Sequence, residues 1–147
     1  KTKHGFICAN AGIDKSNVEK NTVLLLPEDP NKSAHSIRKK MENLTGKKIA
    51  VIISDTFGRA WRKGQVNFAI GSSGINPITS YIGRTDTFKN ELNATEIAVI
   101  DEIASAAELV MEKTLNVPIA IVRGVNYEDS KNNASELIRE DEEDFFL

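Results

Sequence analysis

The chain has 147 residues, of which 40% are hydrophobic and 27% are charged, and its formal net charge at pH 7 is −2. This length fits one domain with a core of its own, and the negative charge argues against a nucleic-acid partner bound mainly through phosphates. No apolar run approaches the ~20 residues of a membrane-spanning helix, so no membrane partner is expected. The single cysteine excludes an internal disulfide. A reducing compartment fits this, and we expect a cytoplasmic protein.

The first third of the chain predicts two strands and a helix. Residues 5–11 and 22–26 are short apolar runs, each followed by a turn residue, as is typical of strands. The segment after Asp29 and Pro30 predicts a helix that Asn31 or Ser33 caps and that Gly46 ends. Apolar residues recur in it at helical spacing and predict a buried face made of Ala34, Ile37, Met41 and Leu44.

The remaining two thirds predict further strands and helices. Residues 49–53 (IAVII) form a β-branched run typical of a strand buried on both faces, and 118–122 predict another. Residues 66–70 give a weaker strand signal. The clearest helix spans 93–115, with a capping box at its start, and a last helix is expected within 130–139. Helices packed on a mixed sheet predict an α/β fold, with α+β as the alternative.

Several common catalytic motifs are absent. No GxxxxGK[ST] sequence marks a phosphate-binding loop. The SDTFG segment lacks the second aspartate of the aspartate-nucleophile phosphatases, because Ile53 stands in its place. The two histidines, His4 and His35, do not have zinc-ligand spacing.

Two aspartates follow predicted strands and indicate a ligand site. Asp14 lies in a turn after the first strand, and Asp55 directly follows the strand at 49–53. Ligands of open α/β sheets gather beyond the carboxyl ends of strands. Carboxylates there, with Thr56 beside them, suit a hard divalent cation that also contacts phosphate oxygens. The alternatives are an Asx-turn or helix cap for Asp14 and a strand-end cap for Asp55.

Other side chains have both a functional and a structural interpretation. Arg59 and Arg62 could clamp a phosphate or carboxylate while Trp61 stacks on a planar ring, or the three could form an ordinary surface loop. Arg84 and Asp86 predict a salt bridge or a substrate contact.

Three further features are expected to be structural. Cys8 is predicted to be a small buried side chain rather than a nucleophile, because no histidine is placed to activate it. Asp101 is predicted to be solvated surface, with a partner contact as the alternative. The acidic run 140–144 is predicted to be solvated, and Phe145 and Phe146 to dock on the body.

Several motifs in one order resemble a known family, the coenzyme F-420:L-glutamate ligases. They are HGFICANAGIDKSNV, LLPEDPNKSA, ISDTFGRAWRKG, GRTD and DEIASAAELVMEK. The resemblance implies that residues 1–147 are the C-terminal three-fifths of a larger two-lobed ligase domain whose N-terminal portion precedes them. It also implies a homodimer for the full-length protein.

The resemblance further implies a ligase that adds L-glutamate to the coenzyme F-420 precursor. GTP would phosphorylate a substrate carboxylate, and glutamate would displace the phosphate to form an amide or γ-glutamyl bond. Two divalent cations, Mn²⁺ or Mg²⁺, would assist, with K⁺ as a possible activator. By position, Asp14 and Asp55 would bind one metal as catalytic residues, and Thr56 the second. The nucleotide would contact Asn17, Met111, Glu112 and Lys113, and the substrate Arg59, Trp61 and Arg62.

The chain departs from the family pattern at a few positions. Ala60 replaces a proline, Glu112 replaces a glycine, and Lys89 and Asn90 stand in a segment that usually reads FGREL. A carboxylate at position 112 would repel a nearby phosphate. Two alternatives therefore stay open: a relative that binds nucleotide or metal without turnover, and a glutamate ligase for another acid, such as a folate-like or pterin compound.

Overall fold

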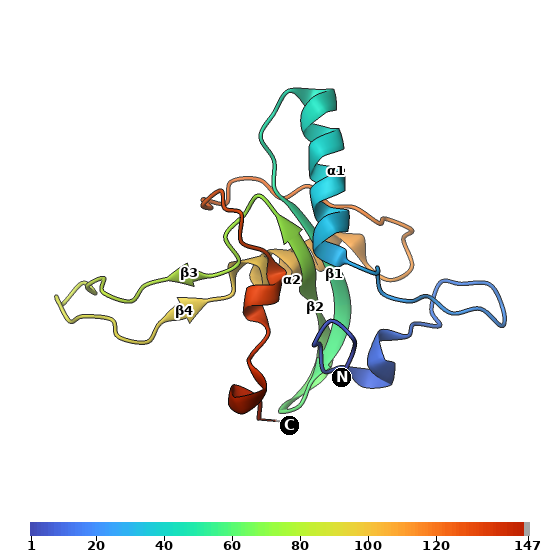
Figure 1. Ribbon diagram of the computed structural model, residues 1–147, viewed down its shortest axis with the longest axis horizontal. Coiled ribbons are helices and arrows are strands. Elements are labelled where there is room, and N and C mark those ends of the chain that lie inside the picture. The colour runs from blue at the N-terminus through green and yellow to red at the C-terminus, as the bar shows by residue number, and fades with distance from the viewer. Residues whose placement is uncertain (146–147) are drawn as a thin grey trace.

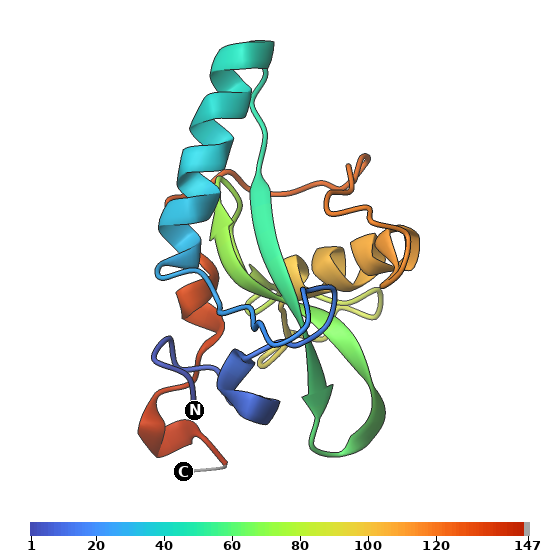
Figure 2. The same cartoon turned by 90° about the vertical axis from the view of Figure 1, so that its right-hand side faces the viewer.

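The computed structural model describes residues 1–145, and a long antiparallel hairpin of β1 (Val51–Arg59) and β2 (Arg62–Ser73) lies at its centre (Figure 1). Figure 2 shows α1 (Pro30–Thr45) and α2 (Val99–Met111) on opposite sides of this hairpin. The predicted α/β class, with helices packed on a sheet, is confirmed, and the strands are antiparallel. The remaining elements are short: η1 (Ala9–Gly12), β3 (Thr79–Ser80), β4 (Glu96–Ile97), η2 (Ala134–Leu137) and η3 (Asp141–Glu143).

Helix α1 begins at Pro30, earlier than predicted. Asp29, rather than Asn31 or Ser33, is the N-cap, because its extended backbone lets the carboxylate accept the Lys32 N–H at 2.9 Å. Pro30 follows at the first helical position, where its missing N–H is harmless. Gly46 ends the helix in the left-handed conformation, as predicted.

The predicted buried face of α1 is wrong beyond its first turns. Ala34 is fully buried, but Ile37 and Met41 are partly exposed and Leu44 is 81% exposed. Figure 2 shows the reason, since the second half of α1 extends past the end of the β1–β2 hairpin. A helical apolar stripe is buried only where another element lies against it.

Two contacts attach the start of α1 to β2. A Cβ added to Gly71 would lie 2.5 Å from the carbonyl carbon of Pro30, so only glycine lets the helix approach the strand this closely. The next residue, Ser72, donates its backbone N–H to Asn31 Oδ1 at 2.9 Å. Together these contacts fix where the first turns of α1 lie.

Helix α2 packs on the other face and is attached to β2 at a bulge. The register changes between Ile53 and Ser54, which leaves Ile70 of β2 without a partner in the ladder. Beside it, Ala69 donates its N–H to Asp101 Oδ1 at 2.8 Å. The solvated-surface interpretation of Asp101 is therefore wrong. The core lies at this contact and includes Ala69, Ile75, Ile100 and Ala134.

Three predicted strands are not strands. Residues 5–11 lead into η1, residues 22–26 contribute one bridge between Leu24 and Asp14, and residues 118–122 are irregular. The side chains of Ile119 and Ile121 are 77% and 78% exposed. Apolar runs become strands only where a neighbouring segment accepts and donates their backbone hydrogen bonds. Within residues 1–145, these runs find almost none.

The predicted helix at 93–115 is shorter than expected. Glu96 and Ile97 pair with β3, so the capping box does not form, and α2 begins at Val99 without a side-chain cap. Of the apolar residues that recur at helical spacing in this segment, Ile100 and Ala104 are buried, whereas Leu115 lies beyond α2 and is 53% exposed. The predicted helix within 130–139 is only the 3₁₀ turn η2.

An arm carrying β3 and β4 projects from the body (Figure 1). Arg84 and Asp86 lie on it but do not form an ion pair. The Arg84 guanidinium stacks over Tyr81 at 4.9 Å, and Asp86 accepts the N–H groups of Phe88 and Asn90, both at 2.8 Å. The predicted salt bridge is therefore replaced by two local contacts that shape the turn.

The predicted docking of the C-terminal aromatic residues is wrong for Phe145. Its ring is exposed, and Arg139 lies over it at 5.4 Å. Phe146 lies outside the described residues. None of the helices within residues 1–145 has the length and apolar character needed to cross a membrane.

Replacing Asp101 tests its attachment to β2. We expect Asp101→Ala to lower the free energy of unfolding by about 1–3 kcal/mol, because the Ala69 N–H would lose its acceptor. Asp101→Asn keeps an acceptor oxygen and should unfold at nearly the same urea concentration as the parent. Glu102→Ala, which removes an exposed carboxylate from the same turn, is the control. Equal stability of the alanine and asparagine variants at position 101 would contradict this role.

The parent protein and Asp101→Asn should also differ in how their stability depends on pH. Burial raises the pKa of Asp101, with the Ala69 N–H opposing it. The folded protein therefore binds this proton more tightly than the unfolded chain, and stability decreases as pH rises through the raised pKa. In urea titrations across this range, Asp101→Asn should lack that decrease.

Candidate functional site

A cavity of about 500 Å³ brings together residues that are far apart in the sequence. The segment around η1, the middle of β1 and the residues after α2 form its walls. Five of the residues predicted to bind metal or nucleotide line it, namely Asp14, Asn17, Asp55, Thr56 and Lys113. We call it the Asp14–Asp55 cavity.

The chain enters this cavity through a tight turn. Asn10 and Ala11 have φ angles of 54° and 50°, and Gly12 follows with 76°. A Cβ on Gly12 would lie 2.7 Å from the Leu26 side chain, so glycine is required for this approach. Directly afterwards, Asp14 and Leu24 exchange backbone hydrogen bonds of 3.1 and 2.8 Å, which fixes the Asp14 backbone.

Asp14 is held by its own loop. Its Oδ1 accepts the Ser16 N–H at 2.7 Å and the Ser16 hydroxyl at 2.8 Å. The Ser16 hydrogen bonds are the main reason that the pKa of Asp14 lies below its usual value. The Asx-turn that the sequence offered as an alternative therefore exists, and it orients an ionised carboxylate that also lines the cavity.

Asp55 lies within a strand and not beyond one. It belongs to β1, opposite Phe68, because the β1–β2 pairing continues through Gly58. The predicted position past the strand end is therefore wrong, although the predicted convergence with Asp14 is seen. Burial is the largest influence on Asp55 and raises its pKa, and the charge of Asp14 adds to this. The Thr56 N–H, donated at 2.8 Å, and the charge of Lys113 oppose the shift.

The Thr56 hydroxyl hydrogen is already used in a hydrogen bond. It donates to Asn67 Oδ1 at 2.7 Å, across the β1–β2 ladder. Because the hydrogen points at Asn67, the oxygen lone pairs are the groups left to meet a cation or a donor. Successive strand residues alternate faces, so Thr56 and Asp55 point to opposite sides of the hairpin.

Asn17 joins the first loop to the end of α2. Its Nδ2 donates to the carbonyl oxygen of Lys113 at 3.0 Å, across 96 positions of the chain. The positive charge of Lys113 lowers the pKa of both Asp14 and Asp55, which places an ammonium group near two carboxylates. Met111 and Glu112, which were also predicted to bind nucleotide, do not line the cavity.

Several lining residues carried little signal in the sequence. Ser16 could have been found from its D-x-S spacing after Asp14. Gln65 and Thr114 reach the cavity only because the hairpin and α2 bring them there. Cys8 also lines it, and burial together with Asp55 raises the pKa of its thiol. A raised pKa keeps a thiol protonated and unreactive.

Arg59, Trp61 and Arg62 do not line this cavity. They lie at the tip of the β1–β2 hairpin, four or more residues from Asp55 along the strands. Arg59 donates from Nη2 to the Lys63 carbonyl at 3.2 Å, and Trp61 is 75% exposed. Their predicted contact with substrate would therefore occur away from the two aspartates.

The donor set fits a divalent cation that is shared with phosphate. Within residues 1–145, no group of three or more His, Cys, Asp or Glu side chains could hold a metal alone. Mg²⁺ and similar ions are often bound by one or two carboxylates, with substrate phosphates and water completing the shell. Asp14 and Asp55 supply two carboxylates, and Lys113 supplies a positive charge that can attract phosphate oxygens.

Comparison with known proteins gives a consistent result. A family model described as F420-0:Gamma-glutamyl ligase matches residues 1–124. The chain is 48% identical to the coenzyme F420:L-glutamate ligase of Methanocaldococcus jannaschii over 147 residues, and 46% identical to that of Archaeoglobus fulgidus over 145. The alignments cover 99% and 98% of this chain. The chain spans only 59% and 58% of these relatives.

Glu112 allows a direct test of backbone strain beside the cavity. Its φ of 47° and ψ of 168° fall in a region that is essentially restricted to glycine, where other residues lose about 1–3 kcal/mol. Glycine also makes the unfolded chain more flexible, by about 0.4–1 kcal/mol. We therefore expect Glu112→Gly to raise the midpoint of thermal unfolding.

The matched control is Glu108→Gly, one turn earlier in α2, where the backbone is helical. It should lower stability by about 0.5–1 kcal/mol. If both glycine variants were destabilised equally, Glu112 would not be strained.

Proposed function

Because the chain belongs to the F420-0:gamma-glutamyl ligase family, we propose that it acts in a GTP-dependent ligase that adds L-glutamate to the coenzyme F420 precursor. The relatives are named coenzyme F420:L-glutamate ligases, and the activity is proposed for the full-length protein because the chain spans 59% of their length. The observation that supports it best is the meeting of Asp14, Asp55 and Lys113 in one cavity.

The proposal includes two divalent cations, Mn²⁺ or Mg²⁺, with K⁺ as an activator. Asp14 and Asp55 would hold one cation. The family pattern assigns the second to Thr56, whose hydroxyl would bind it on the side of the hairpin opposite to Asp55. When bound, these ions neutralise charge on the phosphates and on the transferring group. The low pKa of Asp14 supports this, because its carboxylate is ionised before any cation arrives.

The protein side chains would position the phosphates. Lys113 extends from the end of α2, and the Asn17 contact to its carbonyl fixes that segment relative to the aspartates. An ammonium in a partly buried cavity interacts with a phosphate more strongly than it would in water. The family pattern also assigns Met111 and Glu112 to the nucleotide; they are the last residue and the C-cap of α2, directly before Lys113.

The proposed chemistry has two steps. The γ-phosphoryl group of GTP passes to a carboxylate oxygen of the acceptor, and GDP leaves. The deprotonated amine of L-glutamate then attacks the acyl carbon, the C–O bond to phosphate breaks, and inorganic phosphate leaves with the bonding electrons. Bound charges help most where charge develops in the transition state, which for phosphoryl transfer is the transferring group. A second round would form a γ-glutamyl bond.

We further propose a cytoplasmic homodimer for the full-length protein. Exposed apolar side chains support a surface that another chain covers, because soluble proteins seldom leave such residues grouped in solvent. Strongly exposed apolar side chains include Leu44, Phe88, Leu109, Ile119 and Ile121.

One observation favours a second candidate, a relative that binds nucleotide or metal without turnover. Glu112 places a carboxylate and a strained backbone where the family pattern has glycine. The remote position of Arg59, Trp61 and Arg62 keeps a third candidate open, a glutamate ligase for a different acid.

The deciding experiment uses the full-length protein with GTP, Mn²⁺, L-glutamate and the glutamate-free coenzyme precursor, read by product mass. We expect a gain of glutamyl units that requires GTP and metal. Asp55→Asn should lower the rate more than about 100-fold, since even indirect partners of a metal change activity 10- to 100-fold. Asp86→Asn on the arm is the carboxylate control. Unchanged turnover in Asp55→Asn would exclude Asp55 as a ligand.

Cys8 provides the complementary prediction. Cys8→Ala should keep most of the activity, because a thiol with a raised pKa is a poor nucleophile at neutral pH. Complete loss of product in a variant with an unchanged circular dichroism spectrum would refute the structural interpretation of Cys8.

A further inference from the structure

A second and larger cavity, of about 1220 Å³, lies beside the first turns of α1. The end of β2, the helix and the segment around η2 form its walls, and we call it the α1 cavity. It shares no lining residue with the Asp14–Asp55 cavity. Phe6 lines the α1 cavity, and its ring lies 6.0 Å from that of Phe57, which lines the other. The two cavities are therefore neighbours, with this aromatic pair between them.

Two buried polar atoms in this cavity have no partner within the described chain. Ser72 is only 2% exposed, and its backbone N–H is bonded to Asn31, but its hydroxyl has no hydrogen bond. His4 contacts the Glu28 carbonyl through Nε2 at 3.1 Å, and its Nδ1 is buried without a partner. Buried polar atoms are nearly always hydrogen-bonded, so a bound group in the cavity would account for both.

The charges around the cavity leave one cation and one anion unmatched. Arg38 pairs with Glu42 and Asp129 at 2.9 and 3.2 Å, Lys32 pairs with Asp29, and Lys39 pairs with Glu42. Lys131 and Glu28, which also line the cavity, form no ion pair within residues 1–145. One free charge of each sign suits a zwitterion, and a simple anion would leave Glu28 repelling it.

The walls are tied together before any ligand binds. Asn31 accepts from Ser72 of β2 and donates from Nδ2 to the Ser135 hydroxyl of η2 at 3.0 Å. One amide thus joins three walls. The Arg38 guanidinium packs directly against Gly74, whose φ of 80° favours glycine. Such preorganisation reduces the ordering that binding requires.

We propose that the α1 cavity binds the amino-acid substrate as a zwitterion, and this rests on the proposed ligase function. Lys131 and the Ser72 hydroxyl would meet carboxylates, and Glu28 would meet the ammonium group. The volume exceeds that of one amino acid. A γ-glutamyl chain end carries the carboxylates but no ammonium group, because its nitrogen is in an amide bond, so it would lack the partner for Glu28.

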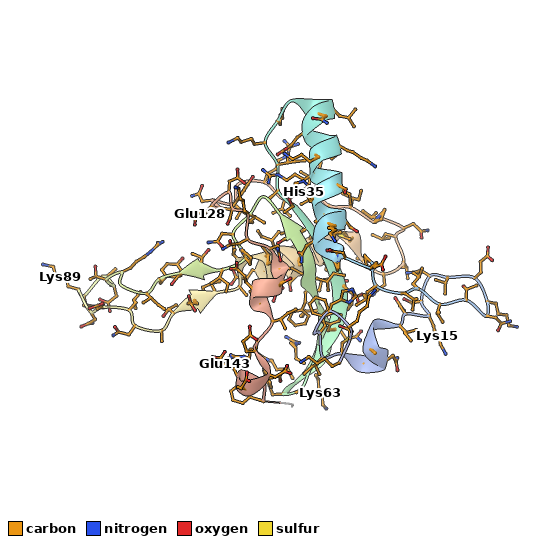
Figure 3. All side chains as sticks on the ribbon, in the orientation of Figure 1. Lys15, His35, Lys63, Lys89, Glu128 and Glu143 are labelled. Carbon is orange, nitrogen blue, oxygen red and sulfur yellow. The ribbon has the colours of Figure 1, made fainter. Side chains whose placement is uncertain are left out.

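The test is calorimetric titration of the full-length protein with L-glutamate, without GTP or metal. Ser72→Ala and Lys131→Gln should each weaken binding about tenfold, as expected for losing a hydrogen bond to a charged group. Lys89→Gln, at the end of the arm and far from His35 of α1 (Figure 3), should bind like the parent. Lys131→Gln changes an exposed side chain, so it tests the proposal even if Ser72→Ala folds poorly.

Three further comparisons separate the possible outcomes. γ-Glutamylglutamate is also a zwitterion, so binding of it that is weakened by the same two substitutions supports the proposal. Equal affinity for L-glutamate in parent, Ser72→Ala and Lys131→Gln would overturn the proposal, as would competition by inorganic phosphate alone. GTP with Mn²⁺ is titrated separately against Asp55→Asn. Failure of that titration would count against the ligase function and not against the α1 cavity.

Discussion

The architecture depends on hydrogen bonds between two helix side chains and the backbone of β2. Asn31 of α1 accepts the Ser72 N–H, and Asp101 of α2 accepts the Ala69 N–H. Ala69 lies beside the register change at Ile70, and the helices approach from opposite faces. Because β2 has only β1 as a strand neighbour within residues 1–145, some of its N–H groups point away from the ladder, and here side chains satisfy two of them. These two hydrogen bonds therefore also position the cavities, because α1 forms a wall of the α1 cavity and the residues after α2 line the Asp14–Asp55 cavity.

Local chemistry made part of this predictable. The Gly46 stop of α1, the β-branched run within β1 and the apolar spacing of Ile100 and Ala104 are signals that neighbouring residues carry themselves. The segments 22–26 and 118–122 are largely exposed although their composition predicts burial, because burial requires a partner segment that residues 1–145 do not supply. Asp101 was missed for a related reason: its acceptor role depends on the Ala69 N–H, which is 32 positions away in the chain.

In the candidate site, too, some features follow from local sequence and others depend on how distant segments pair. Asp14, Asn17, Asp55 and Lys113 meet as the family pattern implies, although Asp55 lies in mid-strand. Strand ends are set by pairing, and β1 continues through polar residues because β2 pairs with them. Arg59 and Trp61 were grouped with Asp55 by closeness in sequence. A strand rises about 3.3 Å per residue, so four residues carry Arg59 roughly 13 Å away.

If the proposed function is right, the aromatic rings between the two cavities separate two steps of the reaction that need different surroundings. An acyl phosphate must meet an amine before it meets water, while the nucleotide side needs charge and hydration. Phe6, Phe57 and Phe68 pack in series, with ring centroids 6.0 and 5.6 Å apart, on the sheet face that carries Asp55. Apolar rings there exclude water from the boundary without adding charge. Phosphate chemistry would then stay on the Asp14–Asp55 side, and the Phe6–Phe57 contact would be where the two substrates approach each other.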